Sequence, residues 1–199
     1  MPRTVAETET VAMPAIPVNP APLGLCAFAL TTFVLSAANA GLLTGGKGAV
    51  TIVLGLALFY GGLAQLLAGM WEFKVGNTFG ATAFSSYGAF WIAFGASVQM
   101  HWILAGSNAL GFFLLGWTIF TLIMFIATLK TNLGLILLFG FLTVTFLLLT
   151  VHAFTGTDSI GQTGGYFGLA TALIAWYNAL AGLLVATRAG FTLPIGPRS

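Results

Sequence analysis

The chain alternates between long apolar stretches and short segments that hold the charged residues. An α-helix needs about 20 mostly apolar residues to cross the hydrocarbon core of a bilayer. The stretches are continuously apolar, as in 133–149, whereas strands of a membrane β-barrel alternate apolar and polar positions over about ten residues. The pattern therefore predicts an all-α membrane protein with six transmembrane helices, at residues 23–43, 49–71, 79–99, 108–129, 133–153 and 164–187.

The two ends of the chain differ from these stretches. Residues 1–18 are polar and contain three prolines. They lack the basic start and directly following apolar run of a secretory signal peptide. We therefore expect a flexible cytoplasmic tail over 1–18, a transmembrane domain over 19–190 and a short cytoplasmic tail over 191–199.

The positive charges indicate the orientation. With six spans, Lys47 stands alone on one side of the membrane. The other side collects Arg3, Lys74, Lys130, Arg188 and Arg198. Because cytoplasmic loops carry an excess of Lys and Arg, this asymmetry predicts a multi-pass membrane protein with both termini in the cytoplasm.

Composition excludes several classes of protein. Of the 199 residues, 58% are hydrophobic and 5% are charged, whereas a soluble domain carries about 25% charge. This excludes an ordinary soluble enzyme, a disordered chain and a partner for nucleic acid. The single cysteine, Cys26, excludes an internal disulfide and a cysteine-based zinc site. With no catalytic motif and no lysine in mid-span, we expect no enzyme, no cofactor and no metal. The 26 glycines predict tightly packed helices with a narrow path.

Polar residues within the spans share helix faces, because helical residues three and four apart are neighbours. Three such faces are Phe28, Thr32, Ser36 and Asn39; Thr118, Thr121 and Thr128; and Leu142, Thr145, Leu149 and His152. A hydroxyl can bond a carbonyl of its own helix, whereas the amides of Asn39 and Gln65 need partners elsewhere. Neutral polar groups suit a small neutral solute or a weak acid. The helix starts at 19–20 and 77–78 are hypothetical anion sites, since helix N-termini favour negative charge.

Four segments resemble the acetate uptake transporter family (the YaaH/SatP acetate–succinate permeases). They are Asn-Pro-Ala-Pro-Leu-Gly-Leu at 19–25, Phe-Tyr-Gly-Gly-Leu-Ala-Gln at 59–65, Gly-Asn-Thr-Phe-Gly-Ala-Thr-Ala-Phe-Ser-Ser-Tyr-Gly-Ala-Phe-Trp at 76–91, and Leu-Pro-Ile-Gly at 193–196. The resemblance implies a six-helix subunit of a homohexameric ring, with one path per subunit for acetate and related carboxylates. It also implies a constriction of Phe28, Tyr87 and Leu142. On the predicted spans these three lie within roughly 6 Å of one membrane depth.

The predicted function is transport of acetate and similar small carboxylates, including succinate, across the plasma membrane. Whether transport is channel-like or proton-coupled is left open. We expect the substrate to contact Thr31, Thr32, Asn39, Gln65, Thr82 and Ser86. Glu72 and His152 are candidates for groups linked to proton movement. The alternatives are a surface pair of Glu72 with Lys74 or Lys130, and a purely interfacial His152.

Two other functions are compatible with these features. One is a channel for a small neutral solute such as urea or ammonia. The other is a membrane sensor or assembly protein without transport, which leaves the amides inside the spans unexplained. The expected partners are a small carboxylate, membrane lipid and further copies of the chain in a homohexamer.

Overall fold

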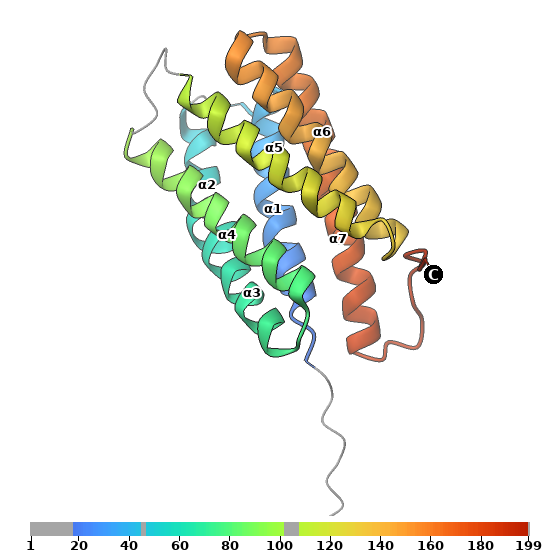
Figure 1. Ribbon diagram of the computed structural model, residues 1–199. Coiled ribbons are helices and arrows are strands. Elements are labelled where there is room, and N and C mark those ends of the chain that lie inside the picture. The colour runs from blue at the N-terminus through green and yellow to red at the C-terminus, as the bar shows by residue number, and fades with distance from the viewer. Residues whose placement is uncertain (1–17, 45–46, 102–107, 199) are drawn as a thin grey trace, which may run out of the picture.

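The computed structural model describes residues 18–44, 47–101 and 108–198, and these residues form helices joined by short connections (Figure 1). The predicted tail over 1–18 therefore lies, except for Val18, outside the described residues. The described part contains no β-strand, only an isolated bridge between Asn132 and Pro197. The helices are α1 (Ala21–Asn39), α2 (Lys47–Leu58), the π-helical η1 (Phe59–Ala64), α3 (Gln65–Lys74), α4 (Thr78–Gln99), α5 (Ala109–Thr128), α6 (Leu133–Thr155) and α7 (Asp158–Ala186).

Among the described residues, five helical stretches are long and apolar enough to cross a membrane. They are Ala21–Asn39, Thr51–Lys74, Ala109–Thr128, Leu133–Thr155 and Asp158–Ala186. The second of these runs through α2, η1 and α3, which follow one another without a break. Helix α4 has 22 residues but is not among the five, because glycine, serine and threonine lower its hydropathy. The prediction of an all-helical fold is confirmed for the described residues, and five of its helical stretches are long and apolar enough to cross a membrane.

The boundary of the last helix differs from the prediction. We expected this helix to begin at residue 164, after the charged Asp158, but it begins at Asp158 itself and has 29 residues. An acidic side chain in the first turn of a helix interacts favourably with the positive end of the helix dipole. The charge therefore belongs to the start of the helix and does not interrupt it.

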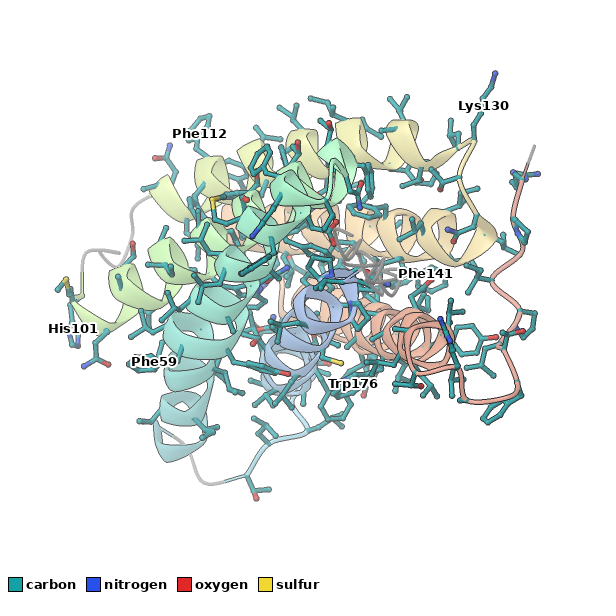
Figure 2. All side chains as sticks on the ribbon, turned by 90° about the horizontal axis from the view of Figure 1, so that it is seen from below. Phe59, His101, Phe112, Lys130, Phe141 and Trp176 are labelled. Atoms are coloured by element: carbon teal, nitrogen blue, oxygen red, sulfur yellow. The ribbon has the colours of Figure 1, made fainter. Side chains whose placement is uncertain are left out.

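Helix α1 packs against α7 and against the stretch η1–α3, α3 packs against α4, and α6 lies between α5 and α7. Glycines bring the backbones together, as predicted. A Cβ atom at Gly88 of α4 would lie 2.7 Å from the backbone nitrogen of Leu66. Large apolar side chains such as Phe112 point away from the bundle (Figure 2) and are exposed, as the lipid-facing side of a membrane helix requires.

The segment after α7 returns to the start of α6. The backbone nitrogens of Leu133 and Gly134 donate hydrogen bonds of 2.9 and 3.0 Å to the carbonyls of Gly196 and Ile195. The first N–H groups of a helix have no partner within the helix, so this segment satisfies two of them in α6. The predicted tail over 191–199 is thus packed against the helical domain as far as Arg198.

Candidate transport path

Phe28, Tyr87 and Leu142 are buried and come together from α1, α4 and α6. The ring centroids of Phe28 and Tyr87 are 5.9 Å apart. The Tyr87 hydroxyl forms a hydrogen bond of 2.9 Å with the hydroxyl of Thr121, which itself donates to the carbonyl of Trp117. This bond to α5 holds the Tyr87 ring in position. The predicted trio therefore lies at one place in the bundle.

A cavity of about 90 Å³ lies on one side of this trio, and we call it the Gln65 cavity. Its lining residues are Ala21, Leu25, Phe28, Gln65, Asn77, Phe79, Gly80, Ala83, Phe84, Tyr87, Leu135, Leu138, Phe139 and Leu142. The Gln65 side chain is 0% exposed, and neither its amide nitrogen nor its amide oxygen has a hydrogen-bond partner among the described residues. The cavity therefore offers a ligand an apolar surface and one available amide.

A second cavity, of about 210 Å³, lies on the other side of the trio, and we call it the Asn39 cavity. Phe28 and Leu142 line both cavities and so separate them. Two faces predicted from helical spacing line the Asn39 cavity in full: Phe28, Thr32, Ser36 and Asn39 from α1, and Leu142, Thr145, Leu149 and His152 from α6. The Thr32 hydroxyl and the indole nitrogen of Trp91 have no hydrogen-bond partner in the described part of the chain.

Each cavity shares lining residues with another pocket at one end of the bundle. The Gln65 cavity shares Asn77 with an open pocket, the Glu72 vestibule, which is lined by Val18, Asn19, Pro20, Glu72, Val75, Asn77, Val185, Ala186 and Arg188. The Asn39 cavity shares Asn39, Leu149 and His152 with a pocket at the other end. This pocket, the Asp158 vestibule, is also lined by Asp158, Gly161 and Gln162. The four pockets share lining residues from one end of the bundle to the other, and we call this row of pockets the candidate path; Phe28 and Leu142 line both of its middle pockets.

The Glu72 vestibule brings together the two helix starts that were hypothetical anion sites. Asn19 accepts a hydrogen bond from the backbone nitrogen of Ala21, and Asn77 accepts one from Gly80. The side-chain nitrogen of Asn77 also donates to a Glu72 carboxylate oxygen over 2.8 Å. Glu72 thus lies beside the N-terminus of α4, at the boundary between the vestibule and the Gln65 cavity.

A profile of the GPR1/FUN34/yaaH family matches residues 7–197. The chain belongs to this family. It is 49% identical over 200 residues to acetate permease A of Emericella nidulans, covering 89% of this chain and 65% of that protein. It is 48% identical to ammonia transport outward protein 2 of Saccharomyces cerevisiae, covering 90% of this chain and 65% of that protein. The chain therefore spans about two thirds of the length of these fungal relatives.

One bacterial relative and one solved bacterial structure are matched over nearly their whole length. The chain is 41% identical to the succinate-acetate/proton symporter SatP of Escherichia coli, covering 89% of this chain and 95% of that protein. Its fold superposes on the structure of the bacterial acetate channel SatP with a TM-score of 0.82 at 42% identity, covering 90% and 99% of the two chains. The resemblance seen in the sequence motifs is confirmed.

Three of the predicted substrate-binding residues lie away from this path. Within the described residues, Thr31, Thr82 and Ser86 line none of the four pockets. Thr31 is wholly buried, and its hydroxyl donates to the carbonyl of Ala27. Successive residues of a helix point about 100° apart, so Thr31 and Ser86 point away from their lining neighbours Thr32 and Tyr87. Thr82 lies five residues before Tyr87 and points about 140° away from it.

The surroundings of Glu72 also differ from one expectation. The alternative of a surface pair with Lys74 or Lys130 is wrong, because the Glu72 side chain is 1% exposed and bonds Asn77. The amine of Lys74 lies 4.4 Å from the ring centroid of Trp71 instead. The partnership of Glu72 with Asn77 was missed, although a helix-capping Asn five residues away is a recognisable signal.

Proposed function

We propose that this chain moves acetate and related small carboxylates, including succinate, across the plasma membrane along the path described above. The observation that carries the proposal is the meeting of Phe28, Tyr87 and Leu142 between two cavities, which share lining residues with pockets at opposite ends of the bundle. The names of relatives at 41–49% identity support the substrate.

The proposed assembly has six spans per subunit, with α4 as the sixth, and both termini in the cytoplasm. Helix α4 supports this count because it is 22 residues long and packs against α2, η1 and α3. With α4 as a span, Lys74, Lys130 and Arg188 lie at the same end as the Glu72 vestibule, as the positive-inside tendency requires. We further propose a homohexamer with one path in each subunit.

In this proposal the trio removes water from the substrate and excludes bulky solutes. Loss of water is costly for a carboxylate, since burying an isolated charge in an apolar medium is opposed by tens of kcal/mol in simple estimates. The amides and hydroxyls on either side, from Thr32, Asn39 and Gln65, replace part of that water. Glu72 and His152 line the pockets at the two ends of the candidate path, and we propose them as the groups linked to proton movement.

A second candidate function is movement of ammonia, favoured by the relative named ammonia transport outward protein 2. A neutral molecule of this size also fits the apolar constriction. The two functions are separated by competition. If the chain carries carboxylates, excess unlabelled acetate reduces the uptake of labelled acetate, and excess ammonia does not reduce it.

The test is uptake of labelled acetate into proteoliposomes containing the full chain, with and without a pH gradient. We expect uptake well above that of protein-free liposomes. Stimulation of uptake by an inward proton gradient would identify proton-coupled transport. Uptake that does not respond to the gradient would identify a channel for the anion. Uptake equal to that of protein-free liposomes under both conditions would overturn the proposed function.

A further inference from the structure

The Gln65 amide is a fully buried polar group with no partner among the described residues. Buried amides in folded proteins are nearly always hydrogen-bonded, because an unsatisfied donor or acceptor loses the bonds it made with water. Gln65 lines the cavity beside the constriction, so both of its hydrogen-bonding atoms are available to whatever enters. This points to a ligand that supplies one acceptor and one donor.

The other polar groups of the Gln65 cavity are already engaged. Asn77 uses its side-chain nitrogen for Glu72 and its oxygen for the N-terminus of α4. The Tyr87 hydroxyl is bonded to Thr121. Among the described residues, no side chain of Lys, Arg, His, Asp or Glu lines this cavity. A ligand therefore meets one free amide and no countercharge.

The π-helical segment η1 is what directs Gln65 into the cavity. In a regular α-helix, the twelve residues from Val53 to Gln65 would turn Gln65 about 120° away from Val53, at 100° per residue. A π-helical turn holds one extra residue, which reduces this angle to about 20°. Val53, Ala57 and Gln65 are accordingly all buried.

Segment η1 packs closely against α1, where the Gly61 backbone lies beside the Thr31 side chain. A Cβ atom at Gly61 would lie 2.8 Å from the Cβ atom of Thr31. Thr31 is therefore a packing residue of α1 and contributes to the orientation of Gln65 without itself lining the cavity.

We infer that the Gln65 cavity binds the carboxylic acid in its protonated, uncharged form. The acid presents one O–H donor and one carbonyl acceptor, and an amide presents one acceptor and N–H donors. The acid proton bonds Oε1 of Gln65, while Nε2 of Gln65 donates to the acid carbonyl. A carboxylate anion has only acceptors, so it leaves Oε1 unsatisfied and its own charge uncompensated in an apolar cavity. This inference rests on the proposed function and specifies the chemical form of its substrate at this point of the path.

Two competitors test the inference on the unmodified chain in proteoliposomes. Acetamide is an uncharged analogue that can make the same pair of hydrogen bonds with Gln65. Trifluoroacetate is a carboxylate that stays ionised throughout the pH range of the assay. We expect excess acetamide to reduce uptake of labelled acetate at least fivefold and trifluoroacetate to leave it within a factor of two.

Gln65→Met keeps the length of the side chain and removes its hydrogen bonds. We expect it to lower acetate uptake about tenfold and to abolish inhibition by acetamide. Gln99→Met makes the same change at an exposed amide at the end of α4. It should alter neither acetate uptake nor its inhibition by acetamide. If trifluoroacetate inhibits as strongly as acetamide, or if acetamide does not inhibit, the inference is overturned while the proposed function stands. If the unmodified chain takes up no acetate, both are overturned.

Discussion

Replacing Phe28 by alanine removes the ring that separates the Gln65 cavity from the Asn39 cavity. The Phe28 side chain lines both cavities, of about 90 and 210 Å³. Without the ring the two spaces join through a wider opening beside Tyr87 and Leu142. We therefore expect Phe28→Ala to admit larger carboxylates.

The magnitude follows from what the ring does to a passing solute. A solute too bulky for the constriction passes only by displacing packed side chains, which opposes it by about 1–3 kcal/mol, and butyrate, with two more methylene groups than acetate, bears more of this cost. Removing about 1.4 kcal/mol of that barrier corresponds to a tenfold faster step. Butyrate uptake relative to acetate uptake should therefore rise about tenfold in Phe28→Ala. The protein is also destabilised, since loss of a buried aromatic side chain costs about 3–5 kcal/mol in soluble cores.

The assay is uptake of labelled acetate and labelled butyrate into the same proteoliposomes. Taking the ratio of the two rates removes differences in the amount of folded protein. Phe112→Ala is the matched control, because the Phe112 ring points away from the bundle (Figure 2) and is 60% exposed. If Phe28→Ala leaves both the acetate rate and the butyrate-to-acetate ratio unchanged, Phe28 is not part of the constriction.

Three other substitutions test separate parts of the structure. Glu72→Gln keeps an acceptor for Asn77 but cannot exchange a proton, so acetate uptake should lose most of its response to a pH gradient; an undiminished response would exclude Glu72 from proton coupling. Tyr87→Phe removes a buried hydrogen bond to α5 and should lower stability by about 1 kcal/mol, seen as a lower thermal unfolding temperature in detergent, while acetate uptake stays within a factor of two. Gly88→Ala places a Cβ atom 2.7 Å from the backbone of the neighbouring helix. This overpacking should lower the free energy of unfolding by about 1–3 kcal/mol and with it the unfolding temperature. Gly116→Ala, with open space around it, should leave the unfolding temperature unchanged.

Helical spacing predicted correctly which polar residues of α1 and α6 lie on one side of each helix. The faces of α1 and α6 that it grouped together line the Asn39 cavity, since residues three and four apart in a regular helix must share a side. Hydroxyl groups were harder to assign from the sequence. Thr118, Thr121 and Thr145 all donate to carbonyls of their own helices, and only neighbouring helices determine which hydroxyls also reach a cavity.

The sequence by itself determined the helical class and most helix boundaries. The predicted spans 79–99 and 133–153 differ by at most two residues from Thr78–Gln99 and Leu133–Thr155. The thickness of the bilayer sets the length of an apolar run, so the ends of a span can be read from neighbouring residues in the sequence without knowledge of the packing. The motifs likewise identified the trio of Phe28, Tyr87 and Leu142 by resemblance.

Only the tertiary structure decided which way the polar side chains of the second span point. The π-helical turn at Phe59–Ala64 shifts every later residue by about 100° relative to a regular helix. This shift directs Gln65 into a cavity and is accompanied by the burial of Glu72 beside Asn77. Helical spacing read from the sequence assumes a constant turn per residue and therefore misses this shift. The extra residue is accommodated in the structure because Gly61 packs directly against α1.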